Sequence, residues 1–372
     1  MTSFDARPSP RILFGPGRLA ELPDAAKSLG ATNILLVTDS GIVAAGHIRH
    51  ATGLLRDAGL KVTTYQDTHI NPGETDIEAC RAFAEPLAPD LIIGFGGGSS
   101  MDTAKGCNFL LNNGGRMSDY HGYGHAEKPL LPFIAIPTTA GTGSECQSYA
   151  VVSREDSHEK MACGDPKALA KIAILDPELT LSQPQKVATL TALDALSHAL
   201  ESAVCTKRNP ISSAYSRESF RLIASSISSI LKPDAPIGQR SKMLLGAAMA
   251  GSAIENSMLG AAHATANPLT AFFDVPHGHA VALTLPHVIR FNSVDPESAA
   301  IYDDFSSYLG EPLIDWLENI IASAHLPRLD IDITRIPELT AAALPQWTGK
   351  FNPRPINGPE VTAIYTAALT VT

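Results

Sequence analysis

Four runs of almost uninterrupted apolar residues in the first half of the chain restrict its fold more than any other feature. They are NILLVTD (33–39), LKVTTYQ (60–66), DLIIGFGGG (90–98) and FIAIPTT (133–139). Continuous Val, Ile and Leu indicate strands that are buried on both faces. Because amphipathic stretches such as 44–59 and 74–88 separate the runs, the pattern predicts a parallel sheet with crossover helices, which is a doubly wound α/β domain.

The pattern changes after about residue 182. Helical spacing dominates 187–204, 212–231, 239–258 and 277–291, and strand signals there are few. We therefore expect an α/β domain over 1–182 that binds a dinucleotide and an all-helical domain over 183–372. A length of 372 residues is typical of two domains.

Charge and composition exclude several classes of function. The chain has 28 Lys and Arg against 38 Asp and Glu, a formal charge of −10, so we expect no nucleic-acid or membrane partner. The first residues lack the basic-then-apolar pattern of a signal peptide, and no apolar run is long enough to span a bilayer, which predicts a cytoplasmic protein. The five cysteines are dispersed, which favours reduced thiols over a disulfide framework.

Two loops that contain glycine follow predicted strands. The first, Gly96–Gly98, precedes a helix that begins near Ser99, where free N–H groups and the helix dipole suit a phosphate. The alternative is a tight turn with Ser100 or Asp102 as the helix cap. The second loop carries four hydroxyl side chains, those of Thr138, Thr139, Thr142 and Ser144. Two such loops at the carboxyl ends of strands favour a nucleotide site.

Asp39 ends the first of the four runs. A carboxylate at this place can accept hydrogen bonds from ribose hydroxyls and repel a 2′-phosphate, which would favour NAD over NADP. Taken alone, capping of the helix that follows is the simpler interpretation.

Asp194 and His198 lie four residues apart in TALDALSHALES and therefore share one face of a predicted helix. His263 and His277 follow in GAAHATANPLTAFFDVPHGHA. One carboxylate and three imidazoles form a donor set suited to Fe(II) or Zn(II). A single Asp/His pair is more often a surface pair, but small apolar neighbours predict burial here, and buried charges need a partner.

Taken together, the motifs of this chain resemble those of the iron-containing (group III) alcohol dehydrogenases. They occur in family order and are GGGSSMDTAKG, PTTAGTGSE, ILDPELT, LDALSHALES, AAHATANPL, VPHGHA and FNPRP. The resemblance implies an N-terminal Rossmann-like parallel-sheet domain and a C-terminal helical domain, the architecture of the dehydroquinate synthase-like superfamily. It also implies a homodimer.

The resemblance assigns site residues through these motifs. The metal ligands would be Asp194, His198, His263 and His277. The cofactor contacts would be Asp39 and Asn71 at the adenosine side, Gly97, Gly98, Ser99 and Asp102 at the pyrophosphate, Thr138, Thr139, Thr142 and Ser144 toward the phosphates and nicotinamide, and Lys160 and Leu179 along the cofactor.

Two positions, Asn267 and His279, depart from the family pattern. In many members, a histidine lies four residues after the ligand that corresponds to His263. This chain has Asn267 there, so the proton relay and the substrate range stay open. His279 follows His277 by two residues, where many relatives have a nonpolar residue. His279 is a candidate to compensate for the missing histidine, and the alternative is a role beside the metal ligands or as a solvated side chain.

The expected activity is reversible hydride transfer between NAD(H) and a small primary alcohol or aldehyde. Fe(II), or alternatively Zn(II), would act as a Lewis acid on the substrate oxygen. Two alternatives on the same architecture stay open. One is a zinc glycerol dehydrogenase-like enzyme, which usually lacks a histidine at the position of His198. The other is an NAD-using carbon–oxygen lyase or cyclase of the dehydroquinate synthase type.

Overall fold

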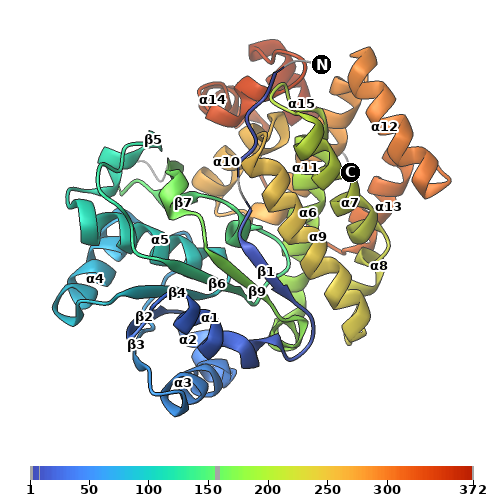
Figure 1. Ribbon diagram of the computed structural model, residues 1–372. Coiled ribbons are helices and arrows are strands. Elements are labelled where there is room, and N and C mark those ends of the chain that lie inside the picture. Colours follow the sequence, from blue (N-terminus) through green and yellow to red (C-terminus); the bar gives the residue numbers. More distant parts are fainter. Residues whose placement is uncertain (1–2, 8, 156–159, 371–372) are drawn as a thin grey trace. The chain divides into compact units, whose positions relative to one another are not determined.

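The computed structural model describes residues 3–7, 9–155 and 160–370 (Figure 1). Its contacts divide the chain into two compact units, Pro8–Gln183 and Pro184–Thr372, and the residues up to Arg7 belong to the second unit. Arg7 is held there because its guanidinium pairs with Glu255 at 3.1 Å and its backbone N–H donates to Asn256 at 2.7 Å.

A six-stranded parallel sheet forms the centre of the first unit. In spatial order its strands are β1 (Arg11–Phe14), β9 (Ile172–Leu175), β6 (Phe133–Pro137), β4 (Leu91–Gly96), β2 (Asn33–Val37) and β3 (Lys61–Tyr65). Each neighbouring pair is parallel, which confirms the predicted sheet. β1 and β9 were not predicted, because strands of four residues are too short to show a period.

Helices cover both faces of this sheet. They are α1 (Leu22–Ser28), α2 (Ser40–Ala44), α3 (His47–Asp57), α4 (Glu74–Ala84) and α5 (Gly98–Asn113), with short turns η1 (Arg18–Glu21) and η2 (Glu85–Leu87). Successive strand residues point to opposite faces: Ile34 and Leu36 pack with α1 and α3, whereas Leu35 and Val37 pack with α4 and α5. This two-sided burial explains why the strands have no polar face.

A second, three-stranded sheet was not predicted. Its order is β5 (Gly122–Tyr123), β8 (Lys160–Gly164) and β7 (Tyr149–Ser153), and β7 runs antiparallel to β8. Its buried side chains join Ile77 of α4 and Phe109 of α5 in one apolar cluster. The remaining turns of this unit are η3 (Met117–Tyr120), η4 (Ser144–Cys146), η5 (Pro166–Ala168) and η6 (Pro177–Ser182).

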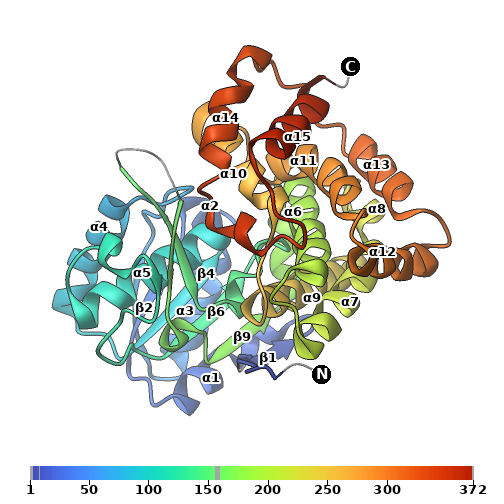
Figure 2. The same cartoon turned by 90° about the horizontal axis from the view of Figure 1, so that it is seen from above.

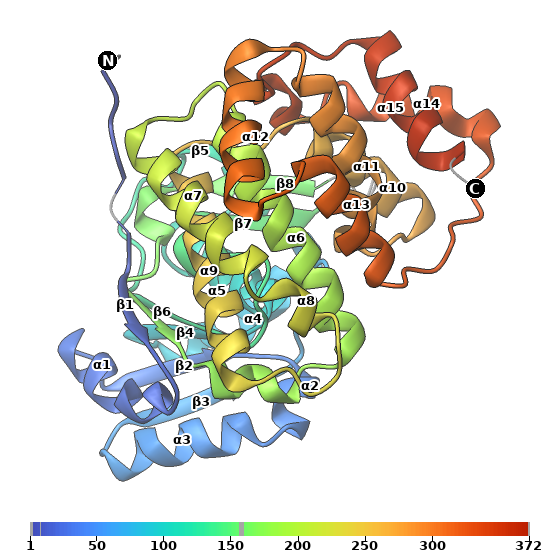
Figure 3. The same cartoon turned by 90° about the vertical axis from the view of Figure 1, so that its right-hand side faces the viewer.

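In the described part of the second unit, every regular element is a helix or a helical turn. Its helices are α6 (Gln185–Val204), α7 (Pro210–Ala224), α8 (Ile227–Ile230), α9 (Ile237–Glu255), α10 (Ala261–Phe273), α11 (His277–Asn292), α12 (Pro296–Leu309), α13 (Leu313–Ser323), α14 (Ile336–Ala343) and α15 (Gly358–Thr370), with turns η7 (Ile333–Arg335) and η8 (Trp347–Phe351). α6 packs against α7, α9 and α11 (Figure 3). α10 lies beside α14 (Figure 2).

The structure corrects one of the predicted helices. The segment 212–231 is interrupted, since α7 ends at Ala224 and α8 begins at Ile227. The hydroxyls of Ser225 and Ser226 both donate to the carbonyl of Leu222, at 3.0 and 2.8 Å, and such bonds compete with the helical backbone. Within the described residues, no helix combines the length and apolarity that a membrane span requires.

Candidate metal centre and nucleotide site

Three helices of the second unit carry the predicted metal ligands. Asp194 and His198 lie on α6 and are buried, His263 lies in the first turn of α10, and His277 is the first residue of α11. Gly278 permits a very close approach of α11 to α6, because a Cβ at this position would lie 2.0 Å from the carbonyl oxygen of Leu190. Helix packing therefore determines where His277 lies.

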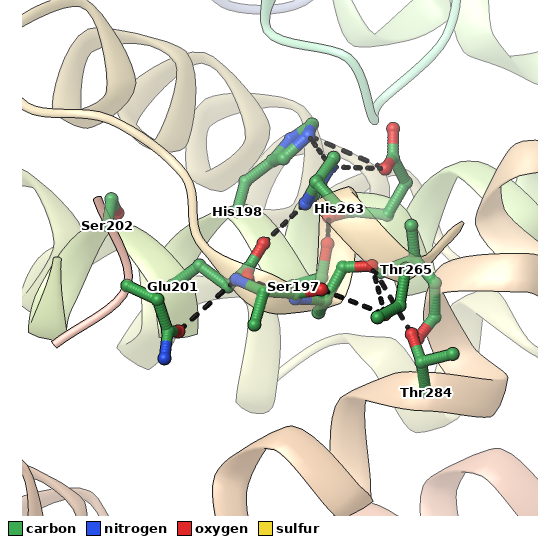
Figure 4. A network of polar contacts seen from close by, with 12 residues as sticks. Ser197, His198, Glu201, Ser202, His263, Thr265 and Thr284 are labelled. Atoms are coloured by element: carbon green, nitrogen blue, oxygen red, sulfur yellow. Dashed lines mark hydrogen bonds and ion pairs between the residues drawn. The ribbon is translucent and has the colours of Figure 1, made fainter. Parts of the chain in front are cut away.

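The four side chains converge on one carboxylate oxygen. Oδ1 of Asp194 lies 3.4 Å from Nε2 of His198, 3.6 Å from Nε2 of His263 and 3.7 Å from Nε2 of His277. The Nε2 atoms of His198 and His263 are 3.1 Å apart, and Figure 4 shows these two rings turned toward one another. The structure thus brings together all four residues that the resemblance named as ligands.

This arrangement fits a metal ion. Although Oδ1 of Asp194 is buried, it has no hydrogen-bond partner among the described residues, and an unpartnered buried carboxylate oxygen is costly. Donor atoms about 2.1 Å from a tetrahedral ion lie about 3.4 Å from one another. The four separations given above, from 3.1 to 3.7 Å, are close to that value. Asp194, His263 and His277 each place a ligand atom within 4.8 Å of the other two, and one carboxylate with three imidazoles suits Fe(II) or Zn(II).

The electrostatics of the cluster also favour a cation. Burial raises the pKa of Asp194, but the imidazoles of His198, His263 and His277 lower it more, so that the net pKa lies well below its usual range. Burial lowers the pKa of His263, but Glu201 and Asp194 raise it more, to about 9. The site stabilises positive charge, whether this is a proton or a metal ion.

Glu201 is part of this site and was not predicted. It lies on α6, its Oε2 is 2.5 Å from Nδ1 of His263, and its Oε1 accepts the N–H of Ala262 at 2.7 Å (Figure 4). The sequence held a signal for it. Glu201 follows Asp194 by seven residues and His198 by three, which places all three on one helix face.

Asn267 and His279 lie on the same helices as the ligands. Asn267 is one turn after His263 on α10, and its Nδ2 donates to Oε1 of Gln346 at 3.0 Å. This bond holds the amide of Asn267 in one orientation. His279 is buried on α11, and burial, aided by Lys186, lowers its pKa.

In the first unit, the two loops with glycine lie against one another. They adjoin because β4 and β6 are neighbours, and the N–H of Thr138 donates to the carbonyl of Gly96 at 3.0 Å. A Cβ at Gly98 would lie 2.9 Å from Cγ2 of Thr142, and one at Gly97 would lie 3.5 Å from Cγ2 of Thr139. Glycine permits this close packing of the loops.

The N-cap of α5 is Gly97, which has no side chain to cap the helix, and Ser100 and Asp102 lie after this N-cap, within the helix. The start of α5 therefore suits a ligand that accepts from its first N–H groups. The capping alternative for Ser100 and Asp102 is therefore wrong. The hydroxyl of Ser100 donates to Asp39 at 3.1 Å, and Asp102 accepts the hydroxyl of Ser144 at 3.2 Å. Burial raises the pKa of Asp102 to about 6, against the opposing effects of Lys105 and Ser144.

Lys105, another residue that sequence reasoning missed, ties α5 to the hydroxyl loop. Its buried Nζ donates to the carbonyl and the hydroxyl of Ser144 at 2.6 and 2.9 Å. It also donates to the carbonyls of Gln147 at 2.7 Å and Tyr149 at 3.0 Å. A buried ammonium needs such oxygens, so Lys105 and the loop determine each other's position.

The other predicted cofactor residues have varied surroundings. Asp39 caps α2 by accepting the N–H of Ile42 at 3.1 Å, as its simpler interpretation predicted. Asn71 has a φ of 52°, and its N–H donates to the hydroxyl of Ser99 at 3.4 Å. Lys160 begins β8, where its charge acts on Asp102. Leu179 is buried in the apolar cluster between the sheet and α1 and α3.

Two family models match the chain over nearly its whole length. The model described as iron-containing alcohol dehydrogenase matches residues 9–177, and the C-terminal model of the Fe-containing alcohol dehydrogenase family matches residues 188–369. The chain belongs to the iron-containing alcohol dehydrogenase family. This finding confirms both the resemblance and the predicted fold class.

Individual relatives agree with this membership. Alcohol dehydrogenase 4 of Schizosaccharomyces pombe is 33% identical over 367 residues, which cover 96% of this chain and 87% of that protein. NAD-dependent methanol dehydrogenase of Bacillus methanolicus is 34% identical over 295 residues, covering 79% and 77%. The crystal structure of sulfoacetaldehyde reductase from Bifidobacterium kashiwanohense in complex with NAD+ is 26% identical, with a TM-score of 0.88 and full coverage of both chains.

Proposed function

We propose that this chain is an NAD(H)-linked oxidoreductase that interconverts a small primary alcohol and its aldehyde, with a divalent iron ion held by Asp194, His198, His263 and His277. The main support is the geometry of the four side chains. Three imidazole Nε2 atoms converge on the buried Oδ1 of Asp194, which lacks a hydrogen-bond partner among the described residues. Family membership supports the reaction class, and two of the relatives reported above are linked to NAD by name.

When bound, the ion would supply a Lewis acid for the substrate oxygen, and NAD(H) would accept or donate the hydride. Two side chains near the proposed ion would contribute to this chemistry. Asp194 keeps its negative charge because the three imidazoles lower its pKa, and this charge offsets half that of a divalent ion. Asn267 holds an uncharged amide one turn from His263, where it would contribute hydrogen bonds but no ionisable proton.

The proposed cofactor residues belong to the first unit and the proposed metal ligands to the second. The uncapped start of α5, with Gly97, Gly98 and Ser99, would bind the pyrophosphate through backbone N–H groups. Asp39 would face the adenosine ribose. Its carboxylate is held in place by Ile42 and Ser100, so it would oppose a 2′-phosphate by charge repulsion.

The test is anaerobic reconstitution with Fe(II), and in parallel with Zn(II), followed by NADH absorbance with a panel of alcohols and aldehydes. We expect activity with NAD to exceed that with NADP, and His263→Ala to lose the bound metal and ~100-fold or more in kcat/KM. His287→Ala is the matched control, because His287 lies on α11 away from the cluster. Light scattering tests the homodimer expected from the family.

Several results would contradict the proposal. Full metal content and full activity in His263→Ala would show that the ligand assignment is wrong. Equal use of NAD and NADP would remove the role given to Asp39. Conversion of a phosphorylated substrate without net NADH change would instead indicate a carbon–oxygen lyase or cyclase.

A further inference from the structure

The first turn of α10, which carries His263, depends on side chains from outside the helix. Its N-cap is Gly260, which offers no side-chain acceptor. The N–H of Ala261 donates to Oδ1 of Asn352 at 3.2 Å, and the N–H of Ala262 donates to Oε1 of Glu201 at 2.7 Å. Because the first N–H groups of a helix have no partner within it, these two acceptors stabilise the start of α10.

Glu201 uses its second oxygen on the ring of His263. Oε2 lies 2.5 Å from Nδ1, and both side chains are buried. A carboxylate can only accept hydrogen bonds, so Nδ1 must carry the proton. A neutral imidazole protonated at Nδ1 has its lone pair on Nε2. This is the atom that faces Asp194 and His198.

Asn352 is itself held by several bonds, so its acceptor is oriented. Its Nδ2 donates to Oδ1 of Asn292 at 2.8 Å and to the carbonyl of Arg354 at 2.7 Å. The space between the two acceptors is small. A Cβ at Gly260 would lie 2.9 Å from Oδ1 of Asn352 and 3.0 Å from Oε1 of Glu201.

We propose that Glu201 is the positioning residue of the metal centre. With one carboxylate it caps α10 and holds His263 in the tautomer whose Nε2 is free to bind an ion. Asn352, from the motif FNPRP, supports the same turn and gives that motif a physical role. This inference rests on the proposed function, because it requires that His263 binds a metal.

The variant Glu201→Gln separates orientation from simple capping. A glutamine fills the same volume and still offers one oxygen to the N–H of Ala262. Its NH2 group then faces Nδ1 of His263, which favours a proton on Nε2 and removes the lone pair that the metal needs. We expect affinity for Zn(II), measured by competition with a chromophoric chelator, to fall about 10- to 100-fold.

Glu255→Gln is the matched control. Glu255 is also buried in the second unit, and its Oε1 pairs with the guanidinium of Arg7 at 3.1 Å. We expect its Zn(II) affinity to equal that of the wild type. A nitrogen-15 NMR spectrum of the histidine rings, recorded at a pH above the raised pKa of His263 so that the ring is neutral, is a second readout. It should show a proton on Nδ1 of His263 in the wild type and on Nε2 in Glu201→Gln.

Gly260→Ala tests the same idea without removing an acceptor, and it replaces Glu201→Gln if that variant does not fold. Its added methyl group should displace Glu201 and Asn352 and weaken Zn(II) binding. If the wild type binds Zn(II) but both variants bind it equally well, this inference is overturned and the metal centre stands. If the wild type binds neither Zn(II) nor Fe(II), the proposed metal centre is overturned as well.

Discussion

At the scale of single residues, several side chains of this protein serve two partners at once. Asp39 caps α2 and accepts the hydroxyl of Ser100, and Glu201 caps α10 while it orients His263. The ammonium group of Lys105 lies within hydrogen-bond distance of four oxygens in the segment from Ser144 to Tyr149. Hydrogen bonds satisfy each of these buried or half-buried charged groups and thereby fix the position of the side chain.

Glu145 is an ionisable residue whose effect on stability should depend on pH. Burial raises its pKa to about 7, although its own backbone N–H and Lys105 lower it in part. The folded protein thus binds a proton that the unfolded chain releases, and the free energy of unfolding falls as pH rises from about 4.5 to about 7.

Glu145→Gln should remove this dependence. We expect the stability of the variant relative to the wild type to increase by up to roughly 3 kcal/mol across that pH window, and to stay level above and below it. Urea denaturation of both proteins from pH 4 to pH 8 measures the difference. Glu127→Gln, at an exposed position, should show no such change, and a pH-independent difference for Glu145→Gln would refute the prediction.

At the scale of elements, the site depends on how closely helices approach one another. α6 carries Asp194, His198 and Glu201 on one face, and α11 reaches it only because Gly278 has no side chain. Helical spacing explains why the three side chains of α6 share one face, and close backbone packing explains the approach of α11.

Gly278→Ala should therefore damage both the fold and the metal centre. Its Cβ would lie 2.0 Å from the carbonyl oxygen of Leu190, a backbone atom that cannot rotate away. We expect a loss of about 3 kcal/mol or more in unfolding free energy, together with weaker metal binding as His277 moves. Gly238→Ala is the control, because nothing lies within 4 Å of its Cβ. It should be neutral or stabilising by up to about 1 kcal/mol.

At the scale of the whole molecule, the two units have, in our proposal, separate ligands. The clusters on both faces of the large sheet belong to Pro8–Gln183. The metal ligands all belong to Pro184–Thr372. Each ligand should therefore stabilise mainly the unit that binds it.

Hydrogen exchange measured by mass spectrometry tests whether each ligand stabilises the unit that binds it. A ligand present at 100 times its Kd stabilises the state that binds it by about 2.7 kcal/mol. We expect NAD to slow exchange in peptides of Pro8–Gln183, around the start of α5, and Zn(II) to slow it in α6, α10 and α11. Protection by NAD confined to the helical unit would contradict the assignment.

Features that depend on local spacing could be predicted from the amino-acid sequence alone. Uninterrupted apolar runs predicted the buried parallel strands, and a separation of four residues placed Asp194 and His198 on one helix face. The joint motifs identified the family. Such inferences succeed because strand and helix periods are properties of the neighbouring backbone.

The contacts between distant segments, in contrast, are seen only in the folded chain. His198 and His263 are 65 residues apart in the chain, yet their Nε2 atoms lie 3.1 Å apart. Asn352 caps a helix 91 residues before it, and Leu179 lies in the apolar core. No local period encodes these contacts, because they follow from the packing of complete helices and strands against one another.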